Sequence, residues 1–392
     1  MSKVLVLTSQ YTGIVGASGV CTRNIVEELK NRGNDVIVLC YENGVKEENV
    51  YAIPTGVKWR NKGKIHKIIS ALKSFFFPNS DKDVVKKFTD KAIEICSNNK
   101  IDLVLFIYFP LESIGVVKPI KELFPDIVTV IYELDSVGDG VFSSSIRNIV
   151  ATKNYERWLT GVYNYADAVI IMKSHERYWM KTWGKKFSKK LLIADIPVLR
   201  ERNFSKTQIS NSVIMLYGGM LGKKYRSPQY LLLLLEKLAT KKNIYMDFYS
   251  KGDCEDLIND FSKKNKFVRQ HGYVGPKELN YAVCNADVLV SLGNKVSNSI
   301  PSKLISYFSY GKPVVHLSSK SDDICREYVN QYPLGLVLDE CDSVEDNADK
   351  FYDFIEKTKN ITESFANVSK SLLMNTPTFS VNLIEICLKI HK

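Results

Sequence analysis

One loop-like segment concentrates positive charge beside glycines. "YGGMLGKKYRSP" (217–228) places Lys223, Lys224 and Arg226 a few residues after paired glycines. Such cations form charge-assisted hydrogen bonds with phosphate oxygens and can stabilise a diphosphate that departs during a reaction. We therefore predict catalytic roles for Lys224 and Arg226 and a ligand-binding role for Lys223. A solvated basic loop is the alternative interpretation.

A second segment has the composition of a phosphate-binding turn. "TSQYTGIVGASGV" (8–20) lies between a strand-like run and a helix-like stretch and contains Gly13, Gly16 and Gly19. Glycines let backbone N–H groups at a helix N-terminus approach a phosphate closely. Gly16 and Gly19 are the predicted contacts. The spacing is not the dinucleotide-binding Gly-x-Gly-x-x-Gly, so a tight turn between strand and helix is the competing interpretation.

A third segment, "NSIPSKL" (298–304), opens a helix-like stretch directly after the strand-like "ADVLVSLG" (286–293). Pro301 suits the first turn of a helix, where free N–H groups and the helix dipole favour an anion. A plain capped helix is the alternative. The predicted ligand contacts of this segment are Asn298, Ser299, Ser302, Lys303 and Leu304.

These three segments must be positioned by a regular series of strands and helices. Short, nearly continuous apolar runs of this kind predict parallel strands that are buried on both faces. Helix-like stretches separate them, which predicts an α/β fold with doubly wound parallel sheets. The strand-like runs lie at 3–8, 35–40, 102–109, 127–134, 167–172, 212–219, 244–250, 267–274, 287–292, 312–318 and 335–340.

The series restarts near residue 212, which predicts two Rossmann-like domains. We place the first domain at 1–205 and the second at 206–374, with the polar stretch 199–212 as linker. Residues 375–392 form an amphipathic terminal helix, whose docking the sequence does not define. Ligands of open parallel sheets bind beyond the carboxyl ends of the strands. We therefore expect two sheets facing across a cleft.

Composition narrows the class of protein. The 392 residues are 45% hydrophobic and 25% charged, as in globular proteins. No apolar run approaches the roughly 18 residues that span a bilayer, and the first residues do not resemble a signal peptide, so we expect a cytoplasmic protein. The 8 Cys form no Cys-x-x-Cys pair and the 5 His are dispersed. We therefore predict neither a metal site nor a disulfide framework.

The net charge of +11 favours an anionic partner. The segment 58–78, "KWRNKGKIHKIISALKSFFFP", contains six cations and no acid, with Trp59 and a Phe75–Phe77 cluster. Its apolar residues recur at helical spacing, which is typical of a helix lying among lipid headgroups. We predict that this segment contacts an anionic membrane surface. A core helix with solvated lysines is the alternative.

Together these motifs resemble the retaining, nucleotide-sugar-dependent glycosyltransferases of family four, which have the two-domain GT-B fold. "GYVGPKELNYAVCNADVLV" and the following "SLGNKVSNSIPSKLISYFSYGKPVV" look like the donor-binding segment of that family, and "LYGGMLGKKYRSP" resembles its phosphate-binding loop. The resemblance covers essentially the whole chain and is most specific at 272–315. It places Tyr273 and Val274 in the donor site.

The resemblance implies a retaining, metal-independent hexosyl transfer, with the donor in the second domain and the acceptor in the first. A UDP-sugar is the favoured donor, and no separate cofactor is needed. A lipid-linked or glycan acceptor and a role in bacterial surface polysaccharide assembly, at the inner face of the cytoplasmic membrane, are expected.

The chain departs from the family pattern at several positions. Asn298 and Ser306 stand where the family has a pair of Glu residues, and Met220 replaces its usual Arg. On the acceptor side Glu133 or Asp135 lies near the position of the family's His, so both are predicted catalytic residues. Three other functions stay open: a nucleotide-sugar epimerase of the same fold, a non-catalytic sugar-nucleotide-binding protein, and a nucleic-acid binder, for which no motif is present.

Overall fold

The structure is a computed structural model of the chain. It describes all residues except 14, 43–45, 55–79, 109–110, 135–145, 182, 203–210, 296–299 and 392, and it leaves out the side chains of 146–152 and 183. The chain forms two units. Unit 1 comprises Met1–Val198 and Met374–Lys392, and unit 2 comprises Leu199–Leu373.

Unit 1 is built on a seven-stranded sheet in the order β3-β2-β1-β4-β5-β6-β7. Every pair of neighbouring strands is parallel. The connections leave in opposite directions from β1 and β4, which are neighbours, so this is the point where the strand order reverses. The strands are β1 (Lys3–Leu7), β2 (Asp35–Tyr41), β3 (Val50–Ile53), β4 (Leu103–Tyr108), β5 (Val128–Glu133), β6 (Ala168–Met172) and β7 (Leu191–Ala194).

Helices cover both faces of this sheet. One face carries α1 (Ala17–Asn31) and α15 (Pro377–Ile390), whose apolar side chains share a core with β1, β2 and β4. Gly33 has a positive φ of 80° just after α1, as expected for a helix stop. The other face is covered by α3 (Lys82–Asn98), α4 (Leu111–Ile114), α5 (Val117–Leu123), α6 (Ile146–Asn164) and α7 (Lys173–Lys181).

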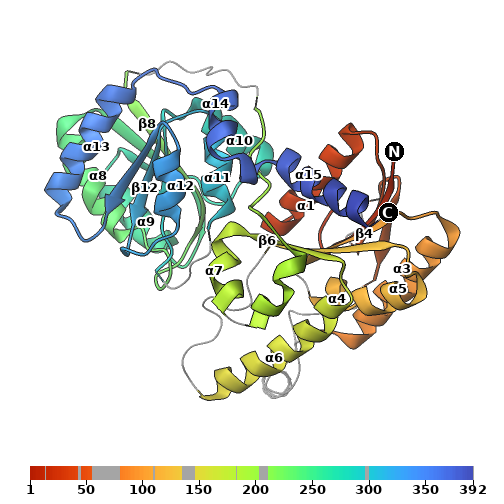
Figure 1. The fold of residues 1–392 in the computed structure, drawn as a ribbon. Helices are drawn as coiled ribbons and strands as arrows, with labels where there is room; N and C mark the ends of the chain where they lie inside the picture. The colour runs from red at the N-terminus through yellow and green to blue at the C-terminus, as the bar shows by residue number, and fades with distance from the viewer. Residues whose placement is uncertain are drawn as a thin grey trace. The chain divides into compact units, whose positions relative to one another are not determined.

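The terminal helix α15 docks on unit 1, although it follows unit 2 in the sequence. It lies beside α1 (Figure 1), and its residues Val381 and Ile384 are completely buried. Arg32 at the end of α1 donates hydrogen bonds to Asn382 at 2.7 Å and to Glu385 at 3.0 Å. These contacts give the docking site that the sequence left undefined.

Unit 2 is built on a six-stranded parallel sheet in the order β10-β9-β8-β11-β12-β13. The strand order reverses between β8 and β11. The strands are β8 (Val213–Leu221), β9 (Ile244–Gly252), β10 (Val268–Gln270), β11 (Val288–Leu292), β12 (Val314–Ser318) and β13 (Gly335–Asp339).

Two groups of helices enclose the second sheet. The helices α8 (Gln229–Lys241), α9 (Glu255–Lys264) and α13 (Val344–Thr358) share one apolar core with the sheet. The opposite face is covered by α10 (Pro276–Asn285), α11 (Ser302–Phe308) and α12 (Cys325–Gln331), which contact β8, β11 and β12 respectively (Figure 1). The short α14 (Phe365–Ser371) precedes the return of the chain to unit 1.

The α/β class with two doubly wound parallel sheets is confirmed, and all eleven predicted strand-like runs contain a strand. Two strands, β3 and β7, were not predicted. Both are four-residue strands at the edges of the first sheet, and Tyr51 of β3 is 38% exposed. They lack the continuous buried character by which the other strands were recognised. Among the described residues, no helix combines the length and apolarity needed to cross a membrane.

We predict that unit 1 loses stability in mild acid because of His175 in α7. This side chain is 2% exposed, and burial lowers its pKa from 6.5 to about 4. The unfolded chain therefore binds a proton near pH 6.5, whereas the folded chain resists it until about pH 4. The free energy of unfolding should fall by about 2 kcal/mol on this account between pH 7.5 and pH 5.

Denaturant unfolding at the two pH values, followed by tryptophan fluorescence, tests this. All 4 Trp lie within residues 1–198, so the signal reports unit 1. Between pH 7.5 and pH 5, His175→Asn should lose less unfolding free energy than the unchanged chain. His391→Asn, which changes an exposed side chain, should lose as much as the unchanged chain. Equal pH dependence in all three proteins would contradict the assignment.

Candidate functional site

The carboxyl ends of β8 and β11 bring two of the predicted segments together. β8 and β11 are neighbours in the sheet, and their following segments contain residues 222–228 and 293–301. The strand order reverses here, so the two connections diverge toward opposite faces of the sheet. Ligands of doubly wound sheets bind at this kind of position. The candidate site therefore lies in unit 2, at the carboxyl edge of its sheet.

Polar contacts join the two segments. The backbone N–H of Lys295 donates to the carbonyl of Tyr225 at 2.9 Å. The guanidinium Nη2 of Arg226 donates to Oδ1 of Asn294 at 2.6 Å. Gly222 and Arg226 close the first segment into a tight turn through two backbone hydrogen bonds of 3.0 and 2.8 Å. The predicted basic loop is therefore an ordered turn that is anchored to the end of β11.

Arg226 is the only one of the three predicted loop cations that is partly buried, because Lys223 and Lys224 are exposed. Its Nη1 donates weakly to the carbonyl of Met220 at 3.4 Å. Its Nε is sealed from solvent and has no hydrogen-bond partner among the described residues. A buried donor without a partner costs free energy, so it indicates an oxygen that arrives with a ligand.

The helix α11 is tied to the same site. Tyr307 of α11 accepts a hydrogen bond from the backbone N–H of Gly218 at 2.7 Å, and both groups are buried. The predicted residues Ser302, Lys303 and Leu304 form the first turn of α11, directly after Pro301. Asn298 and Ser299, which were predicted with them, lie outside the described residues.

Lys303 sits beside another cation. The Lys303 side chain is partly accessible to solvent, but neighbouring atoms desolvate its ammonium group. This desolvation, together with the nearby charge of Arg202, lowers the pKa of Lys303 below its ordinary value. The Arg202 guanidinium lies 4.9 Å from the ring centroid of Tyr310. Among the described residues no ion pair joins these two cations to a shared acid, and such a pair of cations favours an anionic ligand.

Tyr273 and Val274 follow β10 at the same edge of the sheet. Tyr273 is 63% exposed, and the Lys251 ammonium lies 4.0 Å from its ring centroid. In the same part of unit 2, the rings of Tyr249 in β9 and His271 after β10 stack with their centroids 4.4 Å apart. An exposed aromatic ring offers a flat surface on which a nucleotide base can stack. The assignment of Tyr273 and Val274 to the donor site stays a prediction.

In unit 1 the predicted residues lie at the carboxyl edge of the first sheet. The backbone N–H of Gly16 donates to the side chain of Gln10 at 2.6 Å, so this donor is already used. A Cβ on Gly19 would lie 2.5 Å from Cβ of Val15, which makes close packing a sufficient reason for that glycine. Their assignment to ligand binding stays a prediction.

Glu133 ends β5 and is only 4% exposed. Its carboxylate accepts hydrogen bonds from Tyr163 of α6 at 3.0 Å and from Trp179 of α7 at 3.2 Å. These bonds hold α6 and α7 against the sheet, so Glu133 has a structural task whatever its part in catalysis. Asp135, the other predicted acid, lies outside the described residues.

A buried polar network beneath the unit 2 site was missed by the sequence analysis. His316 of β12 is completely buried and lies 2.9 Å from Oδ2 of Asp323 and 3.2 Å from Oγ of Ser291. Burial alone would raise the pKa of Asp323, but hydrogen bonds from His316 and from the Cys325 amide lower it. The isolated His in the apolar run "KPVVHLS" was the one available signal.

The His316, Asp323 and Cys325 side chains form the only group of potential metal ligands in the part of the chain that the structure describes. Their ligand atoms lie within 4.8 Å of one another. Both oxygens of Asp323 already accept hydrogen bonds, at 2.9 Å from His316 and at 3.0 Å from the amide of Cys325. The contacts are those of a hydrogen-bonded network, and the expectation of a metal-free site stays a prediction.

Another acid approaches the site from β13. Glu340 follows that strand, and its carboxylate lies 4.0 Å from the Lys295 ammonium. Burial raises the pKa of Glu340, Lys295 opposes that shift, and Asp323 adds to it. Glu340 is thus partly desolvated, and its charge is balanced by Lys295, the residue after Asn294.

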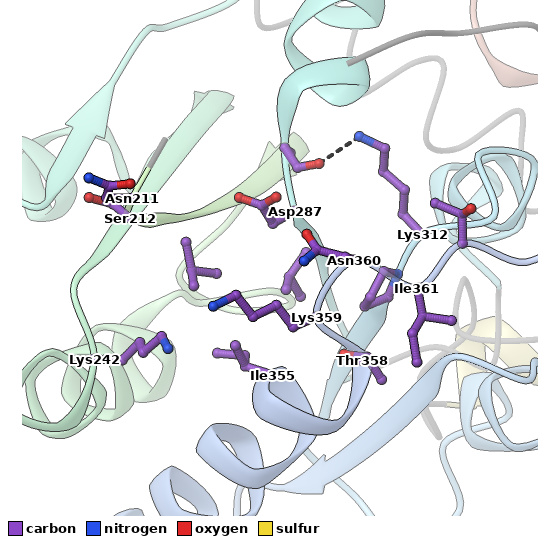
Figure 2. A pocket seen from close by; sticks show the side chains of 15 residues that line it. Asn211, Ser212, Lys242, Asp287, Lys312, Ile355, Thr358, Lys359, Asn360 and Ile361 are labelled. Carbon is purple, nitrogen blue, oxygen red and sulfur yellow. Dashed lines mark hydrogen bonds between the residues drawn. The ribbon is translucent and has the colours of Figure 1, made fainter. Parts of the chain in front are cut away.

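A cavity of about 630 Å³ lies at the opposite, amino end of the unit 2 sheet (Figure 2). Lys312 on its wall donates to the carbonyls of Val283, Cys284 and Ala286, so its charge caps the end of α10. Asp287 accepts the Ile214 N–H at 2.9 Å. These polar groups serve the fold, and the cavity is not at the edge where parallel sheets bind their ligands.

No protein-family model and no curated protein sequence matches the chain. Solved structures are similar along its full length. Sucrose-phosphate synthase from Thermosynechococcus elongatus aligns over 100% of both chains at 13% identity with a TM-score of 0.63. The apo form of WaaB, a lipopolysaccharide outer core galactosyltransferase, aligns over 100% of both at 12% identity with a TM-score of 0.57.

A third similar structure is TarM of S. aureus, in a complex that contains UDP. It aligns over 99% of both chains at 12% identity with a TM-score of 0.55. At such low identity the likeness shows the fold alone. The chain has the GT-B fold of these glycosyltransferases, as predicted.

We predict that Tyr307→Phe destabilises unit 2. The substitution removes one oxygen and leaves the buried N–H of Gly218 without its 2.7 Å acceptor. Leaving a buried donor unsatisfied costs about 1 to 3 kcal/mol. Urea unfolding followed by circular dichroism should show this loss.

The control is Tyr281→Phe, in the same unit, where the side chain is 54% exposed. That substitution should change the free energy of unfolding by less than about 0.5 kcal/mol. If both variants unfold at the same urea concentration, Tyr307 does not hold α11 to the glycines of β8.

Proposed function

We propose that the protein is a glycosyltransferase that moves a sugar from a nucleotide diphosphate donor, with a UDP-sugar favoured, to an acceptor hydroxyl with retention. The observation that carries the proposal is Arg226, whose buried Nε has no hydrogen-bond partner among the described residues at the carboxyl edge of a doubly wound sheet. The GT-B fold, shared with sugar transferases that include one in complex with UDP, supports it.

Unit 2 would bind the donor. Arg226 is placed to donate to a diphosphate oxygen, and exposed Lys223 and Lys224 on the same turn would add positive charge. Lys303 in the first turn of α11 would contribute a further cation, and Tyr273 a surface for the base. Asn298 and Ser306 replace the acids that the resembled family uses.

The reaction breaks the bond between the anomeric carbon and the diphosphate oxygen and forms a bond from that carbon to the acceptor oxygen. The acceptor hydroxyl passes its proton to an oxygen of the departing diphosphate, and the nucleoside diphosphate leaves with the electron pair of the broken bond. Cations at the diphosphate stabilise the charge that develops there, which lowers the barrier without a metal ion. Unit 1 would bind the acceptor.

A non-catalytic sugar-nucleotide-binding protein is the second candidate, favoured by the missing family acids. An epimerase of the same fold would need an acid and a base, and Glu133 is already hydrogen-bonded to Tyr163 and Trp179. Release of nucleoside diphosphate that depends on an added acceptor would support transfer. Release without an acceptor would support an epimerase, and tight binding without release a binding protein.

We predict that Arg226→Ala lowers the turnover rate with a transferable donor. Losing a charge-assisted contact to the leaving diphosphate should cost roughly 2 to 4 kcal/mol of transition-state stabilisation. The measurement is nucleoside diphosphate release at saturating donor and acceptor. Lys263→Ala, which removes an exposed cation from α9, is the control and should turn over at the normal rate. A normal rate for Arg226→Ala would remove Arg226 from the mechanism.

We further propose that the acceptor is a lipid-linked or glycan precursor of a bacterial surface polysaccharide, met at the inner face of the cytoplasmic membrane. The support is the segment 58–78, with six cations and an aromatic cluster. This segment lies outside the described residues, so the proposal rests on its sequence. Each cation near an anionic leaflet contributes about 1 kcal/mol, and salt weakens the attraction.

Vesicle co-sedimentation tests the membrane contact. The protein should pellet with anionic vesicles at low salt, less at high salt, and little with neutral vesicles. Changing Lys62, Lys64 and Lys67 to Glu should release it, whereas changing Lys263 to Glu in unit 2 should not. Protein that stays in the supernatant with anionic vesicles at low salt would overturn the membrane proposal and leave the donor site unaffected.

A further inference from the structure

Asn294 links the end of β11 to Arg226, the partly buried cation of the basic turn 222–226. Its Oδ1 accepts from Nη2 of Arg226 at 2.6 Å, and the Asn294 side chain is only 8% exposed. The next residue, Lys295, binds the neighbouring carbonyl of Tyr225 through its backbone N–H at 2.9 Å. Two hydrogen bonds therefore fix the Arg226 turn to one strand end.

We propose that Asn294 is the positioning residue for Arg226 and orients its guanidinium so that Nε faces the diphosphate of the donor. This inference rests on the proposed function, because it assumes a diphosphate at Arg226. An arginine has donors on three nitrogens in one rigid plane. Asn294 holds Nη2, the Met220 carbonyl accepts a weaker bond from Nη1, and the Tyr217 side chain also interacts with the guanidinium. These contacts together set the direction of Nε.

The position of Asn294 is fixed by the close packing of the preceding residue, Gly293. The preceding Gly293 packs so closely that a Cβ there would lie 2.2 Å from Oδ2 of Asp323. Its N–H donates to the carbonyl of Leu317 at 2.8 Å. Asp323 cannot move away easily, because His316 and the Cys325 amide bond its two oxygens. The strand end that carries Asn294 is therefore rigid before any ligand binds.

Rigidity at this point matters for a leaving group. A flexible arginine loses conformational freedom when it grips a phosphate, whereas one already held in place loses little. A neutral amide is a suitable holder, because it supplies an acceptor oxygen without cancelling the positive charge. An acid at 294 would hold the guanidinium equally well but would compete with the diphosphate for it.

A double-mutant cycle on the full chain tests the proposal. The probe is UDP, and dTDP, GDP and ADP are also titrated so that the diphosphate bound most tightly by the unchanged chain is used. Calorimetry gives the affinity for four proteins: unchanged, Asn294→Ala, Arg226→Ala and the double variant. We expect Asn294→Ala alone to weaken binding about tenfold, and to change it less than twofold when Arg226 is already Ala.

Two further variants guard against a purely structural effect. Asn294→Leu keeps nearly the same shape without the acceptor and should weaken binding like Asn294→Ala even if the alanine variant unfolds. Asn285→Ala removes another buried Asn, at the amino end of β11, where it donates to the Tyr281 carbonyl at 3.0 Å. It should leave the diphosphate affinity unchanged.

The outcomes separate the two levels of the argument. If Asn294→Ala weakens binding equally in both backgrounds, Asn294 does not act through Arg226, and the positioning role falls while the donor site stands. The same holds if Asn294→Ala has no effect while Arg226→Ala does. If Arg226→Ala itself leaves every diphosphate affinity unchanged, the contact assumed in the proposed function fails, and the positioning role fails with it.

Discussion

The structure depends on one topological constraint, the reversal of strand order between β8 and β11. Parallel neighbours whose connections leave toward opposite faces cannot cover the end of the sheet between them. Backbone N–H groups and side chains at that edge are then open to a ligand. In unit 2 this constraint places the turn that contains Arg226 beside residues 293–295. Arg226 and Asn294 are hydrogen-bonded there although they are 68 positions apart in the sequence. The proposed contacts of Arg226, Lys223, Lys224 and Lys303 follow from that neighbourhood, whereas Tyr273 and Val274 follow β10 at the edge of the sheet.

The same constraint explains why the site combines a fixed backbone with a buried hydrogen-bond donor that has no partner among the described residues. The sheet beneath it is rigid, because β11 and β12 are buried on both faces and His316 of β12 contacts Ser291 of β11 at 3.2 Å. The turn above is fixed by the bonds of Lys295 and Asn294. Among the described residues at this edge, the Nε of Arg226 and the Oγ of Ser319, just after β12, are buried without a partner. A donor that is held in a fixed direction and has no partner favours an anion whose oxygen lies at the matching position.

The sequence predicted the parts of this arrangement that local patterns encode. Continuous apolar runs identified β8 and β11, and glycines beside cations identified the turn. It could not identify Asn294, because an Asn after a strand is an ordinary turn residue until its distant partner is known. Edge strands β3 and β7, and the docking of α15 on unit 1, were missed for a related reason. Each depends on neighbours far away in the sequence, such as Arg32 with Glu385.

The distribution of acids at the site bears on the proposed absence of a metal. A divalent cation that bridges a diphosphate needs carboxylates that face the ligand with free oxygens. Among the described residues near the Arg226 turn, Asp323 is bonded by His316 and the Cys325 amide, and Glu340 is balanced by Lys295. Asp253, which follows β9, accepts the backbone N–H of Lys223 at 2.7 Å. Beside these acids stand the cations Lys223, Lys224, Arg226 and Lys303. The described carboxylates at this edge thus have partners within the chain, which is why the proposed function assigns the diphosphate to protein cations rather than to a metal ion.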